Sequence, residues 1–321
     1  MRQSMRFAMV LALVAALLGA PTAWAAPIVF GTAAQKEFDN MPFLIAKEKG
    51  LFEQEGVQVE LFHFKGGGEF VSGFATGKVH LGFTSFASAL RGMVRGVPIR
   101  IVAQTSHFPV FWGLMVRPDS PIKTIKDLKP GARISITTEG GLTHYVALLM
   151  LQQAGLDVGQ ATLVPLGAGP QMPAALRAGQ IDAAVVWSPV GPELQRAGAG
   201  RYVAKLTDML PAFTFSGVVA SQDFIQKDPE SIRKILRAYR KGLAWMREHP
   251  DETVKLMAQW YDMEPAIAQD VYKESIRNFT DDGRIDLKGL EFVIDTSVKF
   301  KFLDKPLSVE NAADTRFVPI K

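Results

Sequence analysis

The chain has 321 residues, of which 48% are hydrophobic and 21% charged, which is enough for about two domains with cores of ordinary size. It has no cysteine, which excludes disulfide bonds, thiolate metal sites and a lipid-modified cysteine. The formal net charge is only +4 and Lys and Arg form no dense cluster, so the composition argues against nucleic-acid binding.

The first 25 residues have the pattern of an export signal. Arg2 and Arg6 precede an uncharged run at residues 7–20, and Ala23-Trp24-Ala25 is a small-x-small cleavage sequence. The run is short for a membrane span, which makes an uncleaved anchor the less favoured alternative. We therefore expect residues 1–25 to be a cleaved signal peptide and the mature chain to be a soluble protein of the periplasm.

After the signal, apolar segments typical of strands alternate with segments typical of helices. Strands are predicted at residues 28–30, 57–64, 98–104, 133–137, 161–166 and 183–187, with extended segments at 111–116 and 213–220. Helices are predicted at residues 41–49, 143–154, 229–248, 251–261, 264–277 and 287–302. The alternation favours an α/β fold with mostly parallel sheets flanked by helices.

One segment of the chain has a weaker copy 102 residues later. Residues 62–90 read FHFKGGGEFVSGFATGKVHLGFTSFASAL, and residues 164–189 read VPLGAGPQMPAALRAGQIDAAVVWSP. Gly67 then aligns with Gly169, Gly77 with Gly179, His80 with Asp182, and Ser85 with Trp187. The copies predict two equivalent βαβ units, one in each of two lobes.

The two extended segments bracket the second set of elements. If both cross between lobes, lobe one comprises residues 26–115 and 220–321, and lobe two comprises residues 116–219. Two crossing strands are a natural hinge.

Several segments together resemble a known family. The matching segments are Pro42 and Ala46 followed by residues 50–59 (GLFEQEGVQV), 75–83 (ATGKVHLGF), 127–131 (DLKPG) and 178–183 (AGQIDA). In this order and spacing they look like the periplasmic substrate-binding proteins of ABC importers for nitrate, sulfonates and taurine. The same superfamily contains proteins that bind the pyrimidine precursor of thiamine. The resemblance covers nearly the whole mature chain.

The resemblance implies a type II periplasmic binding-protein fold, in which two α/β lobes close over a small molecule. It also implies that the partners are an ABC permease and ATPase, so that the protein meets the membrane only through the permease. His80 departs from the family, which usually has Asp there, as Asp182 is in the second copy. We expect this position to cap a turn, with an effect on local stability more than on ligand choice.

Ligands in open α/β sheets bind beyond the carboxyl ends of the strands. We expect five loops to converge there, at residues 35–40, 66–69, 84–86, 138–143 and 167–171, with residues 187–189 at the edge of lobe two. Gly67, Gly68, Gly140 and Gly141 precede helices, whose first N–H groups favour an anion. Alternatively, these glycines only form tight turns.

Hydroxyl and carboxyl groups in the same loops are further candidates. Ser85, with Thr84, follows a buried strand, and Thr143 either binds ligand or caps its helix. Glu37 and Asp39 would suit an amino group or a ring nitrogen. The favoured alternative is that Asp39 or Asn40 caps the following helix and that Glu37 is solvated.

Aromatic residues and one histidine complete the candidate site. Phe38, Phe86, Trp187 and Phe213 are candidates for the cleft wall, whereas core packing is favoured for Trp112. His144 lies beside the proposed anion loop. His63, His107 and His144 lack the spacing of metal ligands, so no metal and no cofactor are expected.

The sequence lacks Gly-x-Ser-x-Gly, a phosphate-binding P-loop and HExxH, which argues against an enzyme. We therefore expect a monomeric solute-binding protein that captures a small organic anion, such as a sulfonate, a taurine-like compound, nitrate or a carboxylate. A pyrimidine precursor or other heterocycle is the alternative ligand. An enzyme of the same fold, acting through Glu37, Asp39 or His144, is the alternative of another class.

Overall fold

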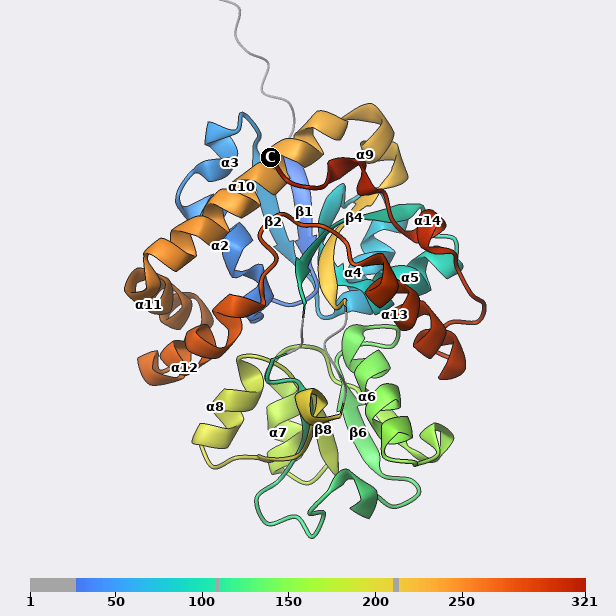
Figure 1. Ribbon diagram of the computed structural model, residues 1–321. Coiled ribbons are helices and arrows are strands. Elements are labelled where there is room, and N and C mark those ends of the chain that lie inside the picture. The colour runs from blue at the N-terminus through green and yellow to red at the C-terminus, as the bar shows by residue number, and fades with distance from the viewer. Residues whose placement is uncertain (1–26, 108–109, 210–213) are drawn as a thin grey trace, which may run out of the picture.

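The computed structural model describes residues 27–107, 110–209 and 214–321, which form two lobes (Figure 1). Within these residues, each lobe contains one five-stranded sheet, ordered β2-β1-β3-β10-β4 in the first lobe and β7-β6-β8-β5-β9 in the second. The proposed signal peptide, residues 1–25, lies outside the described residues.

The first sheet is mostly parallel. Its strands are β1 (Ile28–Thr32), β2 (Val59–His63), β3 (Leu81–Ser85), β4 (Ile99–Ser106) and β10 (Ser216–Ser221). β1 pairs in parallel with β2 and β3, whereas β10 runs antiparallel between β3 and β4.

The second sheet repeats this plan. Its strands are β5 (Gly113–Val116), β6 (Arg133–Ile136), β7 (Thr162–Pro165), β8 (Ala183–Val186) and β9 (Arg201–Lys205). β6 pairs in parallel with β7 and β8, and β5 runs antiparallel between β8 and β9. The predicted two-lobed α/β fold is thereby confirmed.

The predicted lobe boundaries need a small correction, because both fall inside strands. β5, at residues 113–116, belongs wholly to the second sheet, and β10, which begins at Ser216, belongs to the first. The chain therefore crosses between Ser106 and Gly113 and again between Lys205 and Ser216. β5 and β10 each follow a crossing from the other lobe and enter their sheet on the side where the parallel strands end. They therefore run antiparallel to those strands.

Helices cover both sheets, and the last part of the chain returns to the first lobe. The helices of the first lobe are α2 (Met41–Glu48), α3 (Leu51–Gln54), α4 (Gly67–Ala75), α5 (Phe86–Val94), α9 (Gln222–Lys227), α10 (Pro229–Glu248), α11 (Pro250–Tyr261), α12 (Pro265–Ser275), α13 (Leu287–Lys299) and α14 (Val309–Ala312). The second lobe carries α6 (Leu142–Gln153), α7 (Gln171–Arg177) and α8 (Val190–Arg196).

The longest of these helices, α10, packs closely on α2. Gly242 makes this approach possible, because a Cβ there would lie 2.3 Å from the Pro42 carbonyl oxygen. Asp228 caps the start of α10 by accepting a hydrogen bond from the Ser231 N–H, and Pro229 occupies the first turn. The packing of α10 on α2 fixes the position of α2 and of the loop that joins β1 to α2, which leads into the site.

The predicted repeat corresponds to β2-α4-β3 in one lobe and β7-α7-β8 in the other. Gly77 and Gly179, which align in the sequence, both have φ of +69° just after the helix. This left-handed conformation favours glycine in both turns.

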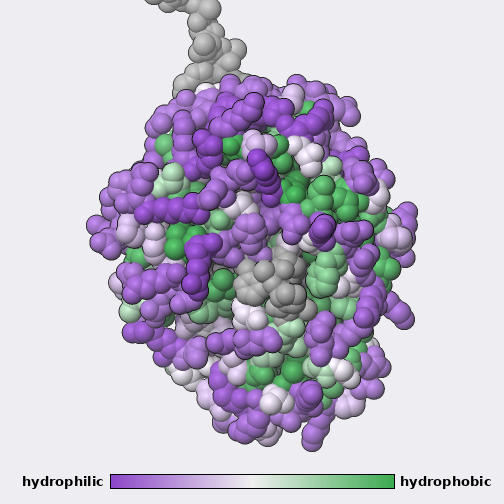
Figure 2. Space-filling view, viewed as in Figure 1, coloured by the Kyte–Doolittle hydropathy of each residue, from purple (hydrophilic) through white to green (hydrophobic). Residues whose placement is uncertain are grey.

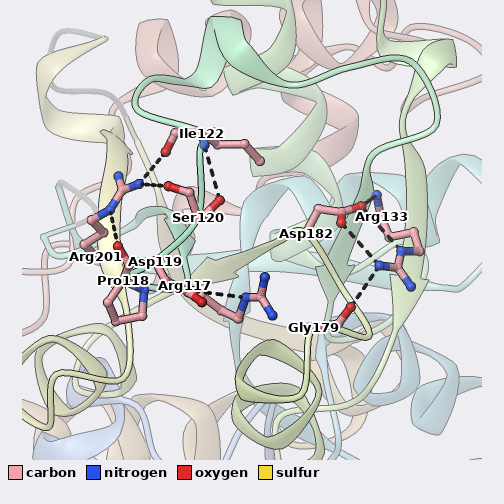
Figure 3. Close-up of polar contacts among 9 residues, drawn as sticks. All are labelled: Arg117, Pro118, Asp119, Ser120, Ile122, Arg133, Gly179, Asp182 and Arg201. Carbon is pink, nitrogen blue, oxygen red and sulfur yellow. Dashed lines mark hydrogen bonds and ion pairs between the residues drawn. The ribbon is translucent and has the colours of Figure 1, made fainter.

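The aligned residues His80 and Asp182 fasten neighbouring strands. The Val29 N–H donates to His80 Nδ1 at 3.0 Å, and the Arg133 N–H donates to Asp182 Oδ2 at 2.7 Å (Figure 3). Each side chain therefore anchors the amino end of the neighbouring parallel strand, β1 or β6, where a turn cap was predicted. This end of each sheet is opposite to the carboxyl ends, where ligands bind.

Polar and charged side chains cover most of the face shown in Figure 2, and apolar side chains appear there as small separate patches. Among the described helices, none combines the length and apolar character needed to cross a bilayer.

Candidate functional site

A cavity with about 350 Å³ of empty space lies between the lobes, where the parallel strands end. The cavity, called here the main chamber, is lined by Ala33, Ala34, Glu37, Gly66, Gly67, Thr84, Ser85, Trp112, Thr137, Leu142, Thr143 and Trp187.

A smaller chamber adjoins the main chamber, because both are lined by Glu37 and Trp112. Its lining consists of Glu37, Phe38, Asp39, Val110, Trp112, Ser188, Ser275 and Asn278. A larger groove lies elsewhere, on the outer surface of the first lobe, and its lining includes Arg100, Ile225 and Arg316. Arg100 is near the amino end of β4, far from the carboxyl ends of the strands, so we place the candidate site in the two chambers between the lobes.

The structure brings only some of the predicted site residues to these chambers. Those that line the main chamber are Glu37, Gly67, Ser85, Thr143 and Trp187. Phe38 and Asp39 line the smaller chamber. Gly68, Phe86, Gly140, Gly141 and His144 line neither chamber, nor does any residue of the loop at 167–171.

Three of the four glycines proposed as anion donors use their N–H groups within the protein. The Gly68 N–H donates to Thr138 Oγ1 at 3.1 Å, the Gly141 N–H to the Thr138 carbonyl oxygen, and the Gly140 N–H to His144 Nδ1. Gly67 differs, because it is the first residue of α4 and lines the main chamber. N–H groups at this position have no partner within their own helix, so Gly67 keeps its suitability for an anion.

His144 and its neighbours form a contact between the lobes. Arg91, from α5, donates to Glu139 of the second lobe at 3.0 Å, and its Nη1 lies 3.3 Å from His144 Nδ1. Burial, together with the nearby positive charge of Arg91, lowers the pKa of His144 to about 4. A neutral imidazole can then accept hydrogen bonds at Nδ1 from the Gly140 N–H of its own lobe and from Arg91 of the first lobe, and the second of these joins the lobes.

Phe86 is wholly buried, with its ring close to Gly217 of β10. The predicted wall position is therefore wrong for this residue, which packs in the core of the first lobe. Phe213, proposed for the same wall, lies outside the described residues.

Hydroxyl groups from both lobes line the main chamber. Ser85 caps α5, since its Oγ accepts from the Ser88 N–H. Thr143 accepts from the Thr137 N–H at 2.8 Å and does not cap α6, whose N-cap is Gly141. Thr84 Oγ1 is buried and has no hydrogen-bond partner among the described residues, which suits a group that binds ligand.

Two carboxyl groups face the chambers: Glu37 lines both chambers, whereas Asp39 lines the smaller one. Asp39 Oδ2 accepts hydrogen bonds from Ser106 Oγ at 2.9 Å and Ser216 Oγ at 3.3 Å. Burial raises the pKa of Asp39 to about 6, against these two hydrogen bonds, which lower it. Asp39 therefore does not cap α2, and neither does Asn40, whose side-chain amide donates to the Ala34 carbonyl oxygen.

Glu37 is only 9% exposed, so the solvated position favoured from the sequence is wrong. Burial, and secondarily the negative charge of Asp39, raise the pKa of Glu37 well above its usual value. Hydrogen bonds to Glu37 from described residues reach its carbonyl oxygen, from Tyr261 Oη and the Asn40 N–H, and none reaches its carboxyl group. The carboxyl group faces both chambers without a protein donor from the described part of the chain.

Two tryptophans form an aromatic wall. The rings of Trp112 and Trp187 lie 6.1 Å apart between centroids, and both line the main chamber. Trp187 Nε1 donates to the Lys36 carbonyl oxygen at 2.8 Å, which joins the second lobe to the first. Core packing was the interpretation favoured for Trp112 from the sequence, but its side chain also lines both chambers.

The lobes touch around the chambers. Lys36 forms an ion pair with Glu193 of α8 at 2.9 Å, and Tyr145 Oη of α6 lies 2.7 Å from Thr296 Oγ1 of α13. The Ala168 N–H also donates to the Lys65 carbonyl oxygen. The structure is thus a closed arrangement of the two lobes.

The sequence did not point to several lining residues: Ala33, Ala34, Val110, Thr137, Ser275 and Asn278. Leu142 and Ser188 lie in segments that were expected at the site, although neither was named. Thr137 ends a predicted strand in the same way as Thr84, and this position was a usable signal. Ser275 had none, because it ends the distant helix α12. In the described ranges, no group of three His, Asp or Glu residues is placed to hold a metal ion.

The chain matches the model of the family described as NMT1/THI5 like over residues 37–253. It is 26% identical over 286 residues to a putative aliphatic sulfonates-binding protein of Bacillus subtilis (strain 168), an alignment that covers 86% of this chain and 83% of that protein.

Solved structures share the fold. The alkanesulfonate-binding protein SsuA from Xanthomonas axonopodis pv. citri, bound to MOPS, superposes with a TM-score of 0.77 at 20% identity, over 92% of this chain and 100% of that chain. The desulfurization enzyme DSZB superposes with a TM-score of 0.63 at 19% identity, over 90% of this chain and 97% of that chain. One fold thus serves both a binding protein and an enzyme. Because the family model spans well over half of its residues, the chain belongs to the NMT1/THI5-like family.

Proposed function

We propose that this protein is the solute-binding component of an ABC importer and captures a small organic anion, a sulfonate or carboxylate, in the main chamber. The observation that carries the proposal is a cavity between the lobes, at the carboxyl ends of both sheets, that is lined by hydroxyl groups from both lobes. The putative sulfonate-binding relative supports this choice of ligand class.

The anionic group would lie among the Gly67 N–H and the hydroxyl groups of Thr84, Ser85, Thr137 and Thr143. Neutral donors of this kind, together with the positive end of a helix dipole, hold an anion without Arg or Lys. The apolar part of the ligand would lie against the two tryptophans. A ligand held by both lobes favours the closed form over the open form, which the permease would distinguish.

A screen of melting temperatures tests this proposal. Ethanesulfonate, isethionate, taurine, nitrate, acetate and a methylated aminopyrimidine would be added to the mature protein. A ligand at one hundred times its Kd should stabilise the protein by about 2.7 kcal/mol. If no sulfonate or carboxylate raises the melting temperature, the proposed ligand class is wrong.

A matched pair of variants locates the site. Thr84→Val removes the unpaired hydroxyl in the main chamber and should weaken sulfonate binding about ten-fold, because a hydrogen bond to a charged group is lost. Thr76→Val is the control, since Thr76 is exposed at the end of α4 and donates only to the Gly73 carbonyl oxygen. Equal affinity in both variants would place the anion elsewhere.

A flat heterocycle is the second candidate ligand, favoured by the pair of tryptophans in the wall. The pyrimidine in the same screen tests it.

An enzyme of the same fold is a distinct proposal, and recovery of chemically unchanged ligand after incubation with the protein would contradict it. We also propose that the protein acts as a monomer in the periplasm and that the permease and ATPase of the importer are its partners. N-terminal sequencing of exported protein tests the proposed cleavage after Ala25.

A further inference from the structure

We propose that the smaller chamber is a subsite for a cationic nitrogen of the ligand, with the Glu37 carboxylate as its counter-charge. This inference rests on the proposed function, because it assigns the other end of a ligand whose anionic group occupies the main chamber. The preferred ligand is then a zwitterion, in which a short apolar linker joins an ammonium group to a sulfonate or carboxylate.

Charge around the two chambers carries the first step. Among the described lining residues, Glu37 and Asp39 are the charged ones, and Lys, Arg and His are absent. Three Lys or Arg residues adjoin lining residues in the sequence. Lys36 pairs with Glu193, Arg277 pairs with Glu274, and Lys65 is exposed. A simple anion would leave both buried carboxyl groups without a counter-charge, whereas a cationic nitrogen stabilises their ionised form against the cost of burial.

The two carboxyl groups differ in what they can still accept. Asp39 already receives hydrogen bonds from Ser106 and Ser216. The Glu37 carboxyl group receives none from the described residues, and Tyr261 Oη reaches only its backbone. Buried carboxylates normally have partners, so Glu37 is the acceptor that remains for a ligand.

Two further acceptors line the same chamber. Ser188 Oγ, from the end of β8, and Ser275 Oγ, from the end of α12, are buried without a hydrogen-bond partner among the described residues. An ammonium group carries three donors. Glu37, Ser188 and Ser275 supply three acceptors from both lobes, and Trp112 adds an aromatic face that favours a cation.

A pair of sulfonates that differ in one group measures the effect of the ammonium group on affinity. Taurine and isethionate have the same two-carbon sulfonate, with an ammonium group in the first and a hydroxyl group in the second. Calorimetry on the mature protein should show taurine binding at least ten-fold more tightly, the effect of a charge-assisted hydrogen bond to a buried partner. The pair β-alanine and 3-hydroxypropanoate repeats the comparison for a carboxylate.

Variants assign the preference to a residue. Glu37→Gln keeps the shape of the side chain and should reduce the preference for taurine to about two-fold or less. Glu48→Gln removes a negative charge from the exposed end of α2 and should leave the preference unchanged. A melting temperature for Glu37→Gln no lower than that of the unchanged protein shows that the variant is folded.

Each outcome decides between the two proposals. Binding of both sulfonates with equal affinity overturns the cation subsite and leaves the proposed function standing. A preference for taurine that survives in Glu37→Gln also overturns the role of Glu37. If neither sulfonate nor either carboxylate binds, the proposed function fails and this inference fails with it.

Discussion

The two lobes share one plan, yet their equivalent loops have different roles. Gly67, at the start of α4, lines the main chamber, and its neighbour Gly68 contacts Thr138 of the other lobe. The aligned Gly169, before α7, is exposed, and none of its loop lines a chamber. The second loop does reach the junction, where the Ala168 N–H donates to the Lys65 carbonyl oxygen, so a place at the junction does not by itself bring a glycine loop to the site.

The second lobe reaches the site through other loops. The segment after β6 supplies Thr137 and Thr143, and the segment after β8 supplies Trp187. In the first lobe the corresponding loops, after β1 and β3, supply Glu37 and Ser85. Equivalent positions therefore carry an acid on one side and hydroxyl groups on the other, which suits a ligand with two different ends.

The largest expected effect tests the unequal glycine loops. A Cβ on Gly68 would lie 2.2 Å from the Glu139 carbonyl oxygen of the second lobe. Gly68→Ala should obstruct closure and weaken ligand binding about 10- to 100-fold, because overpacking costs about 1–3 kcal/mol. Alanine is favoured over glycine within a helix, so the melting temperature without ligand should not fall.

Gly169→Ala is the matched control for Gly68→Ala in calorimetric titrations. A Cβ there would meet only the movable end of the Gln171 side chain at 2.6 Å. We expect binding within about two-fold of the unchanged protein, as for surface substitutions away from a site. Comparable losses in both variants would contradict the asymmetry between the loops.

The second effect concerns two aspartates with opposite pKa shifts. Burial raises the pKa of Asp39 to about 6, so its folded form keeps a proton that the unfolded chain releases. The contribution of Asp39 to the free energy of unfolding is fully present below about pH 4 and is lost as the pH rises through 6. Asp39→Asn should therefore match the unchanged protein near pH 4 and exceed its stability near pH 7, by on the order of 2–3 kcal/mol.

Asp182 supplies the contrast in the second lobe. Burial alone would raise its pKa, but hydrogen bonds and the charge of Arg133 lower it overall. Its contribution is present above about pH 4 and lost below that, so Asp182→Asn should lose stability at pH 7. Urea unfolding at pH 4, 5.5 and 7 measures both variants. The pKa values of His63 and His144 are lowered, so both residues reduce stability as the pH falls below about 6.5, whereas Asp39 increases it. The effect of Asp39 is therefore measured as a difference between the variant and the unchanged protein at each pH.

The third effect concerns Trp187, which stands after β8 where Ser85 ends β3 in the first lobe. Trp187→Phe keeps an aromatic ring but loses the hydrogen bond to the Lys36 carbonyl oxygen of the other lobe. Binding should weaken about five-fold, the value of roughly 1 kcal/mol for such a bond. Trp245→Phe, on α10 and stacked on His249, is the control and should bind normally. Unchanged binding by Trp187→Phe would show that this bond does not contribute to closure.

The smallest effect tests the strand anchors. His80→Asp replaces one acceptor for the Val29 N–H with the residue type found at Asp182. We expect a stability within about 1 kcal/mol of the unchanged protein, whereas His80→Ala should lose about 1–2 kcal/mol by leaving that N–H unpaired. Ligand affinity should not change in either variant. Altered affinity in His80→Asp would contradict a purely structural role for this position.

Much of the fold followed from local patterns. The helix predicted at residues 229–248 coincides with α10, because proline and a capping aspartate mark its start. The edge strand β9 had no comparable pattern, since Arg201 and Lys205 place charges at both of its ends. Local signals therefore identified the buried strands and capped helices but not an edge strand that its neighbours hold in place.

The candidate site was predictable only in part. Glu37, Gly67, Ser85 and Trp187 follow strand ends or precede helices, and such positions face the cleft in any sheet of this kind. The burial of Glu37 could not be predicted, because it depends on α11 and α12, which lie more than 200 residues away in the sequence.

By itself, the sequence determined the alternation of strands and helices, the repeated unit and the residue types available to a ligand. These depend on periodicity, turn chemistry and composition, which are local properties. The tertiary structure decided which of the two glycine loops lines a chamber and which glycine N–H groups the protein itself uses. It also decided which carboxyl group is left without a donor. Those outcomes arise from contacts between segments far apart in the chain, above all Gly68 with Thr138 and Trp187 with Lys36.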